Sequence, residues 1–243
     1  MDINTKKIKK NAFRVTKVRG MAASRVRVPG GHMPVEYLET IKEIAQTYGN
    51  GTIHFTTRQG IEIPGIKMED MEKINELLQP IIDGLSINQL QRGAGYTSAG
   101  TRNIAACIGN RVCPYANYDT TAFAKKIEDV VYPHDFHFKI ALTGCPNDCI
   151  KARMHDFGIM GMTEPQYDVS RCVGCGACEK ACRLKSVEAL TIENHKIRRD
   201  PVKCIDAFWP VQRVRLRAAV KNITALPSWA EPERKTLAWP RTF

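Results

Sequence analysis

The sequence lacks several features that would place it in common classes. It contains no apolar run near the roughly 18 residues that a transmembrane helix needs. No apolar segment follows its basic first residues, so we see no secretory signal and expect a cytoplasmic protein. It has no G-x-G-x-x-G motif, and therefore nothing in it indicates a flavin or nicotinamide site of its own. No cysteine precedes Cys107, so any thiol chemistry belongs to the later part of the chain.

Acidic residues are also scarce, with 25 Asp and Glu against 36 Lys and Arg and a formal net charge of +11. Such a surplus often marks a surface for nucleic acid or membrane, but no groove-reading motif accompanies it, and we expect neither partner. A buried anionic cofactor or substrate would need the same positive charge. The length of 243 residues and the hydrophobic content of 43% are ordinary for a globular chain of one or two domains.

Hydrophobic periodicity predicts a mixed α+β fold. The expected strands cover residues 24–30, 52–57, 60–66 and 137–143, and the expected helices follow Pro34, begin near Glu69 and cover 120–131. The first helix should turn Val35, Leu38, Ile41, Ile44, Ala45 and Tyr48 toward the core, and the second Met71, Ile74, Leu78 and Ile81. The order strand, helix, strand, strand, helix indicates a small α+β half-domain at the start of the chain.

The first cysteine set consists of two separated pairs. Cys107 and Cys113 form C-x5-C, and Cys145 and Cys149 form C-x3-C directly after a predicted strand. Zinc sites usually use C-x2-C knuckles, so this spacing fits poorly with zinc, whereas four thiolates brought together suit an iron–sulfur cube. The alternative is that the four thiols simply pack in the interior, as free cysteines often do.

These motifs resemble the sirohaem and 4Fe-4S family of sulfite and nitrite reductases. The resemblance rests on the two cysteine pairs, with CPNDC at 145–149, and on VRVPGG at 26–31, TTRQGIEIPGI at 56–66 and RNIAAC at 102–107. Together with the cysteine segment that follows, it is most similar to the catalytic subunits of anaerobic sulfite reductases. It implies a sirohaem, a 4Fe-4S cluster coupled to it through Cys149, and six-electron reduction of sulfite to sulfide.

The resemblance also implies roles for basic residues, because sirohaem and sulfite are both anionic and arginine offers planar, permanently charged donors. It places Arg27, Arg102 and Lys139 on the substrate side and Arg58 at the sirohaem carboxylates or in the pocket. His137 stands where the family often has a second basic residue, and on a strand it would project to the same face as Lys139. Without the family, Arg27 is better interpreted as a solvated strand arginine and Arg58 as an edge-strand charge, since most arginines are exposed.

A second cysteine set has the spacing of bacterial ferredoxins. Cys172, Cys175, Cys178 and Cys182 read C-x2-C-x2-C-x3-C and predict a ferredoxin-type 4Fe-4S cluster. In two-cluster ferredoxins the fourth cysteine serves the other cluster, so a second motif should follow. Only Cys204 does. A 3Fe–4S cluster, or a cube that uses Cys182 or Cys204, is the alternative.

The residues after Cys204 suggest a reason for the missing motif. The stretch DAFWPVQ at 206–212 can be encoded so that a shifted reading frame spells Cys-Val-Leu-Ala-Cys-Pro, the end of a ferredoxin motif. We therefore hypothesise a frameshift just after Cys204 and expect residues 205–243 to form a poorly ordered tail. DNA sequence across the Cys204 codon tests this hypothesis.

The expected domains are a ferredoxin-like half-domain at 1–92, a sirohaem and 4Fe-4S domain at 93–165, an incomplete ferredoxin-type segment at 166–204 and the tail. Because the chain has no site for a nicotinamide or flavin, the resemblance implies an NAD(P)H-flavin subunit and an iron–sulfur subunit as partners. It also makes self-association a reasonable expectation, since larger members build one site from two half-repeats. The alternatives are nitrite reduction on the same cofactors, a haem-free iron–sulfur electron-transfer protein and a zinc-structured binding module.

Overall fold

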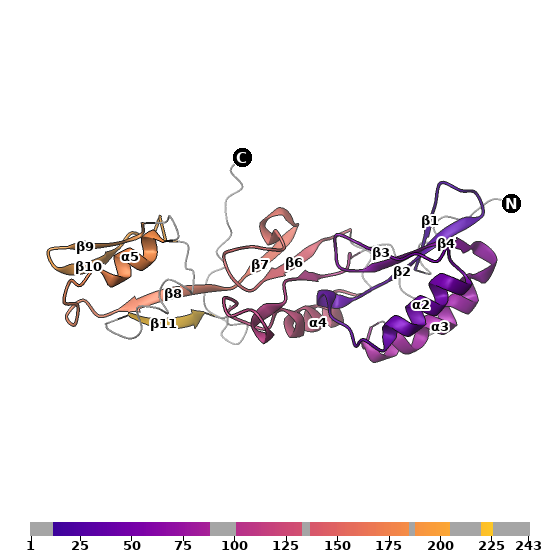
Figure 1. The fold of residues 1–243 in the computed structure, drawn as a ribbon, viewed down its shortest axis with the longest axis horizontal. Helices are drawn as coiled ribbons and strands as arrows, with labels where there is room; N and C mark the ends of the chain where they lie inside the picture. Colours follow the sequence, from indigo (N-terminus) through magenta and orange to yellow (C-terminus); the bar gives the residue numbers. More distant parts are fainter. Residues whose placement is uncertain (1–11, 88–100, 133–136, 185–187, 205–219, 226–243) are drawn as a thin grey trace. The chain divides into compact units, whose positions relative to one another are not determined.

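The computed structural model describes residues 12–87, 101–132, 137–184, 188–204 and 220–225 (Figure 1). The chain divides into two compact units, Met1–Met160 and Gly161–Phe243, which we name unit 1 and unit 2. Unit 1 contains the predicted half-domain together with nearly all of the predicted sirohaem and 4Fe-4S domain. Among the helices of the described residues, none has the length and apolar character needed to cross a membrane.

Unit 1 begins with a four-stranded antiparallel sheet. Its strands lie in the order β1 (Phe13–Val15), β2 (Met21–Val26), β4 (Ile61–Lys67) and β3 (His54–Phe55). Helices α2 (Tyr37–Thr47) and α3 (Met71–Gly84) lie side by side against this sheet in Figure 1. Short 3-10 turns at Pro29–Gly31 and Met68–Asp70 precede the two helices.

The cores of the two helices follow the predicted periodicity except at Val35 and at Leu38, which was also expected to face inward but is 38% exposed. Ile41, Ile44 and Ala45 of α2 are buried, as are Ile74, Leu78 and Ile81 of α3. Val35 was expected to face inward but is 75% exposed. The reason is that α2 begins only at Tyr37, so Val35 lies before the helix and does not share its buried stripe.

The second half of unit 1 contains a parallel sheet in the order β5 (Ala105–Ala106), β6 (Ile140–Thr143) and β7 (Phe157–Met160). Helix α4 (Thr120–Val131) has the predicted bounds and packs on this sheet. Its first turn is capped by Asp119, whose carboxylate accepts from the N–H groups of Thr121 and Ala122, each at 3.0 Å. Ile104, Leu142 and Ala124 form part of the core between helix and sheet.

Unit 2 contains the helix α5 (Ala177–Arg183), the hairpin β9 (Leu190–Glu193) and β10 (Lys196–Arg199), and the pair β8 (Met162–Tyr167) and β11 (Val220–Ala225). Strand β11 differs from the prediction of a poorly ordered tail, since it pairs with β8 over six residues. Its β-branched Val220, Ile223 and Thr224 favour a strand, and a ladder of backbone bonds needs little from the side chains. The rest of the tail lies outside the described residues.

Candidate functional site

The two cysteine pairs of unit 1 meet because of the parallel sheet. Cys107 directly follows β5, and Cys145 follows β6 after one glycine. Since β5 and β6 are parallel neighbours, their carboxyl ends lie at the same edge of the sheet, where α/β proteins commonly bind ligands. The N–H of Cys107 donates to the carbonyl of Leu142 at 3.0 Å, and the N–H of Gly144 donates to the Cys107 Sγ at 3.1 Å. The first cysteine loop is thus tied directly to the strand and glycine that precede Cys145.

The loop from Cys107 to Cys113 is a tight turn against α4. The N–H of Cys113 donates to the carbonyl of Gly109 at 2.9 Å. Gly109 has φ of +67°, and a Cβ there would lie 2.6 Å from Oγ1 of Thr120, so only glycine fits. The hydroxyl of Thr120 donates to the carbonyl of Cys107. Helix α4 therefore holds the first cysteine loop.

The loop from Cys145 to Cys149 is organised by a buried carboxylate. Asp148 accepts a hydrogen bond from the N–H of Ala152 at 2.7 Å, and its own N–H donates to the carbonyl of Cys145 at 3.2 Å. The segment is a series of turns, and Asp148, with φ of +48°, interrupts any helix between Cys145 and Cys149. Cys145 is buried and Cys149 is exposed, so the latter can be reached by a group outside the protein core.

The four thiols lie close enough to interact. Burial raises the pKa of Cys145, and the nearby thiols of Cys113, Cys149 and Cys107 raise it further. Among the described residues, no three His, Cys, Asp or Glu side chains are close enough to hold one common metal ion. A cube places each thiolate on a different iron and needs wider spacing.

The ferredoxin-type cysteines of unit 2 lie in α5 and in the segment that precedes it. Burial raises the pKa of Cys178, and the thiols of Cys172 and Cys175 raise it too. Cys182 is buried one turn further along α5, where its Sγ accepts from the N–H of Ala189 at 3.2 Å. Cys178 and Cys182 are both buried in one small core, and Cys172 and Cys204 pack against it.

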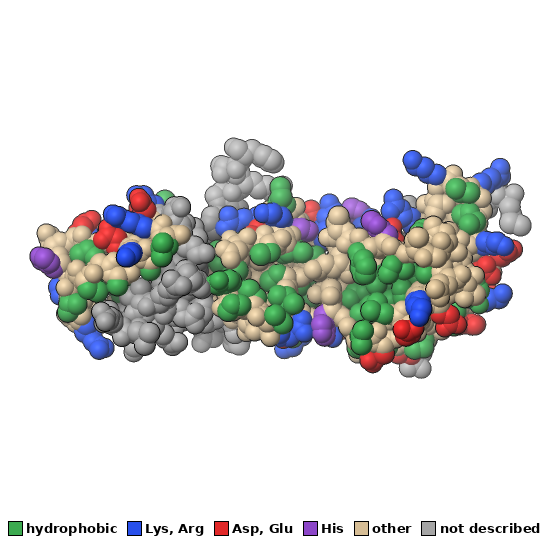
Figure 2. All heavy atoms as spheres, viewed as in Figure 1, with side chains coloured by type: hydrophobic (Ala, Val, Ile, Leu, Met, Phe, Trp, Pro, Cys, Tyr) green, Lys and Arg blue, Asp and Glu red, His purple; other side chains and the backbone are tan. Residues whose placement is uncertain are grey.

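A basic pocket of about 450 Å³ lies before the first residues of β5 and β6. All five basic residues predicted from the sequence contribute to it: Arg27, Arg58, Arg102, His137 and Lys139. Arg14, Arg25 and His54 also line it, and Glu62 is the single carboxylate among its described lining residues. Figure 2 shows Lys, Arg and His side chains close together on the visible face of unit 1 near β3. Such a volume is typical of a small-molecule or cofactor site.

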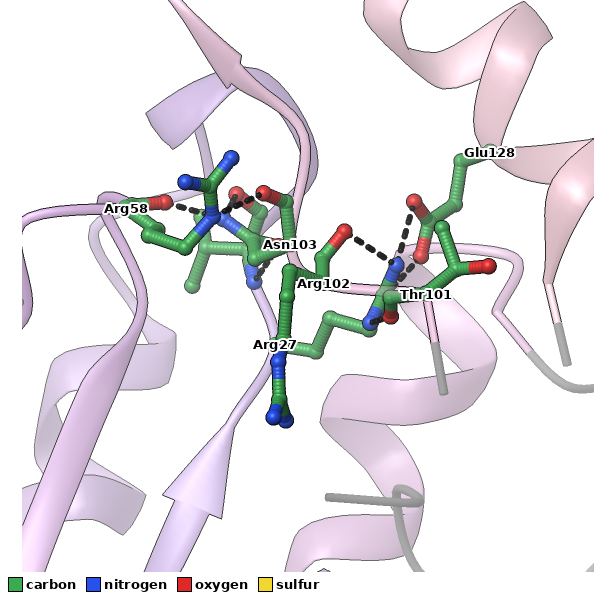
Figure 3. A network of polar contacts seen from close by, with 7 residues as sticks. Arg27, Arg58, Thr101, Arg102, Asn103 and Glu128 are labelled. Atoms are coloured by element: carbon green, nitrogen blue, oxygen red, sulfur yellow. Dashed lines mark hydrogen bonds and ion pairs between the residues drawn. The ribbon is translucent and has the colours of Figure 1, made fainter. Parts of the chain in front are cut away.

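Arg27 differs from its predicted role. Its side chain is only 6% exposed and forms an ion pair with Glu128 of α4, which is itself buried. Figure 3 shows its guanidinium pointing toward Glu128 while the Arg102 side chain extends away from that pair. Arg27 therefore supports a wall of the pocket, and its guanidinium does not point into the pocket as a substrate-binding group would.

Arg58 is held by backbone carbonyls. Its Nε donates to the carbonyl of Asn103 and its Nη2 to that of Ile140, each at 3.3 Å. The Asn103 carboxamide donates in turn to the carbonyls of Val28, at 2.8 Å, and Arg58, at 2.6 Å (Figure 3). The motifs VPGG, TTRQ and RNIAAC thus meet at the Asn103 side chain.

Like charges repel one another in this pocket. Burial lowers the pKa of Arg58, as does neighbouring Arg102. Burial likewise lowers the pKa of Arg102, and Arg25, Arg27 and Arg14 contribute in the same direction. Guanidinium groups remain charged at neutral pH, so a bound anion would relieve this mutual repulsion.

Two arginines of the pocket, Arg25 and Arg14, were not predicted from the sequence. Arg25 donates to Glu62 at 2.6 Å, and Arg14 lies 3.6 Å from the same carboxylate. The motif RVRVPG contains both Arg25 and Arg27 at alternate positions, so the alternation of a strand could have marked either one.

Two models of known protein families match most of the chain. Residues 16–81 match the family model of the nitrite/sulfite reductase ferredoxin-like half domain, and residues 97–224 match that of the nitrite and sulphite reductase 4Fe-4S domain. The second match extends beyond Cys204, where we expected family sequence to end.

Named relatives point the same way. The chain is 46% identical over 192 residues to an anaerobic sulfite reductase subunit of Salmonella typhimurium, covering 77% of this chain and 57% of that protein. It is 36% identical over 169 residues to the coenzyme F420-dependent sulfite reductase of Methanocaldococcus jannaschii, covering 68% of this chain and 25% of that protein. The chain thus spans little more than half the length of the first relative and a quarter of the second.

Among solved structures, dissimilatory sulfite reductase I has a similar fold, with a TM-score of 0.57 at 19% identity, over 83% of this chain and 51% of that one. The matched models cover strands β2, β3 and β4 of the antiparallel sheet, the lining residues of the basic pocket except Arg14, and both cysteine sets. The chain therefore belongs to the nitrite and sulfite reductase family.

Proposed function

We propose that this chain carries the catalytic centre of a sirohaem-dependent oxidoreductase that reduces sulfite to sulfide with six electrons. One observation carries the proposal: the strands β5 and β6 have a pocket of basic side chains before them and four interacting thiols after them. Both named relatives above are sulfite reductases, which favours sulfite over nitrite as the substrate.

The residues present fit both cofactors. Four thiols from two loops would hold a cube, and the exposed Cys149 would be the one that a sirohaem outside the protein core can reach. Sirohaem carries many carboxylates, and the pocket offers five Arg and Lys side chains besides the paired Arg27, against one carboxylate. Lys139 and Cys145 are six residues apart, at most about 20 Å along an extended chain, so a large planar group could reach both.

The chain's own residues would bind and protonate the substrate. When bound, sirohaem would supply the iron at which sulfur is reduced, with electrons delivered by the coupled cluster. Arg102 and Arg25 would hold the sulfite oxygens by charge-assisted hydrogen bonds. Lys139, with His137 beside it in the pocket wall, would hold a proton for an oxygen that leaves as water. Arg58 would hold a sirohaem carboxylate.

Unit 2 would bring electrons to this centre. We assign Cys172, Cys175 and Cys178 to a ferredoxin-type cluster, with Cys182 or Cys204 as its further ligand, because all but Cys175 belong to or pack against the same small core. Reductant would come from an NAD(P)H-flavin subunit and an iron–sulfur subunit, because the sequence carries no nucleotide motif. Self-association would supply a second half-repeat. In this proposal the protein works in the cytoplasm.

The decisive experiment is a visible spectrum of anaerobically purified protein, with iron, acid-labile sulfide and zinc counted in the same sample. We expect sirohaem absorption, iron with matching sulfide, and sulfide production from sulfite with a dithionite-reduced viologen as donor. Zinc without sulfide would overturn the proposal in favour of a structural metal module. Iron and sulfide without haem absorption would overturn it in favour of an electron-transfer protein, and faster turnover of nitrite would reassign the substrate.

Matched cysteine variants separate the two cluster sites. Cys145→Ser should remove the iron of the unit 1 cluster and alter the sirohaem spectrum, because that thiol is the buried one of its set. Cys175→Ser should remove only iron of the unit 2 cluster, because the exposed Cys175 belongs to the other unit. An identical iron loss and identical spectrum in both variants would contradict the assignment of two sites.

A further inference from the structure

The buried Arg27 has every nitrogen of its guanidinium engaged. Its Nε pairs with Glu128, and its Nη2 donates to the other carboxylate oxygen of Glu128 at 3.0 Å. Nη1 donates to the carbonyl of Thr101 at 2.7 Å, and Nη2 also donates to that of Arg102 at 3.1 Å. The guanidinium lies 4.5 Å from the ring centroid of Tyr132, a cation–π contact. A bidentate arginine–carboxylate pair of this kind fixes the orientation of the guanidinium as well as compensating its charge.

These contacts anchor the backbone from which Arg102 enters the pocket. Arg27 holds the carbonyls of Thr101 and Arg102 from one side (Figure 3). From the other side, the N–H of Arg102 donates to the carbonyl of Phe138 at 2.9 Å. Glu128 lies on α4, so one helix fixes both this segment and, through Thr120, the loop of Cys107.

The ion pair of Arg27 and Glu128 also lowers the net positive charge next to Arg102. Arg102 lies among Arg14, Arg25 and Arg27, so repulsion and burial both favour withdrawal of its side chain into solvent. Glu128 compensates the charge of Arg27, and the two carbonyl bonds hold the backbone in place. Loss of Arg27 and Glu128 would remove the hydrogen bonds to the carbonyls of Thr101 and Arg102. The segment would keep only the bond from the N–H of Arg102 to the carbonyl of Phe138 among these three.

We propose that Glu128 is a positioning residue of the basic pocket: through Arg27 it fixes the carbonyls of Thr101 and Arg102 and thereby presents the Arg102 guanidinium to the bound oxyanion. The proposal deepens the proposed function and rests on it for the identity of the anion. A pair that only stabilised the fold would leave the affinity for the anion unchanged.

The test uses a double variant in which both partners become apolar, Arg27→Met with Glu128→Leu. Replacing a buried ion pair by apolar residues is often neutral for stability, and the net charge near the pocket does not change. The sulfite dissociation constant is measured on the holoenzyme from the shift in sirohaem absorbance, with Asp129→Asn, exposed on the same helix, as the control. We expect the constant to rise about tenfold or more in the double variant and to stay at the wild-type value in the control.

A second readout does not need the cofactor. Amide hydrogen exchange at Arg102 should be faster in the double variant, because its segment has lost two of its anchors. If the double variant does not fold, Glu128→Gln keeps the shape but leaves Arg27 charged. If Glu128 positions Arg102, sulfite should bind more weakly to the Glu128→Gln variant. If Glu128 acts only through its negative charge, sulfite should bind more tightly, because the pocket becomes more positive.

Unchanged sulfite affinity together with unchanged exchange at Arg102 would overturn the positioning role. If wild-type protein binds no sulfite at all, the proposed function fails, and the exchange rates still decide whether Glu128 orders the Arg102 segment.

Discussion

Gln59 pairs with the backbone of Ala106 in both directions. The Nε2 of Gln59 donates to the carbonyl of Ala106 at 2.7 Å, and the N–H of Ala106 donates to Oε1 of Gln59 at 2.8 Å. The Gln59 side chain thus makes the two hydrogen bonds with Ala106 of β5 that a neighbouring strand would otherwise make. Ala106 directly precedes Cys107. The loop of TTRQ is thereby locked to the first cysteine loop.

Gln59→Glu should break one half of this pairing. The carboxylate of the Gln59→Glu variant can still accept a hydrogen bond from the N–H of Ala106. It has no proton to donate to the carbonyl of Ala106, and the position is half-buried, so water does not fully replace the lost bond. We expect a loss of about 1–3 kcal/mol in the free energy of unfolding at neutral pH, measured by urea denaturation. The loss should shrink below about pH 4, where a protonated carboxyl can donate.

The control for this change is Gln46→Glu, on the exposed side of α2, where we expect a change within about 0.5 kcal/mol. Equal effects of the two substitutions would show that Gln59 contributes no specific pairing.

Gly31→Ala should be more damaging than Gly51→Ala. Both glycines have positive φ, +64° and +77°, so both variants carry a similar backbone cost of about 1–3 kcal/mol. A Cβ at Gly31 would lie 2.7 Å from the Gln59 carboxamide carbon, whereas a Cβ at Gly51 meets nothing within 4 Å. We expect a further loss of about 1–2 kcal/mol at Gly31 from the disturbed pairing, measured by thermal unfolding. Equal melting temperatures for the two variants would refute the steric argument.

Arg102→Gln should weaken sulfite binding and reduce its dependence on salt. The side chain lies among like charges in the pocket, so it should contribute a charge-assisted bond worth about 1.5–3 kcal/mol, roughly a tenfold to hundredfold rise in KM. Increasing potassium chloride from about 0.05 to about 0.5 M should raise the KM of the wild type more steeply than that of the variant, because salt screens the pocket. Parallel salt curves would argue against a direct contact, and Arg19→Gln, on an exposed turn, serves as the control.

His32 should make the fold less stable at acidic pH. Burial lowers its pKa from the usual 6.5, and nearby Arg111 and Lys125 lower it further, against a smaller opposite effect of Asp119. The unfolded chain then binds a proton more readily than the folded chain, so stability falls as the pH drops through and below about 6.5. His32→Gln should reduce the difference in unfolding free energy between pH 7 and pH 5.5, measured by urea denaturation. His195→Gln, an exposed histidine of unit 2, controls for the loss of an imidazole, and no difference between these two variants would rule out the effect.

The local patterns of the sequence predicted much of the fold. Apolar spacing marked α2, α3 and α4, and the positions of Ile41, Ile74 and Leu78 in the core follow from it. Two cysteine spacings marked two thiol sets in different units. These features depend on neighbours in the chain, so periodicity and spacing suffice to find them. Strand β11 was missed because its pairing with β8 joins segments more than 50 residues apart.

The sequence by itself marked the two thiol sets and five of the basic residues that line one pocket. Only the tertiary structure decided which arginine faces which way. Arg25 and Arg27 are two residues apart and equivalent in any strand pattern, yet Arg27 meets Glu128, 101 residues away along the chain. A buried charged side chain must point toward a group of opposite charge that compensates it. Here that group is distant in the sequence, so no local pattern can identify it.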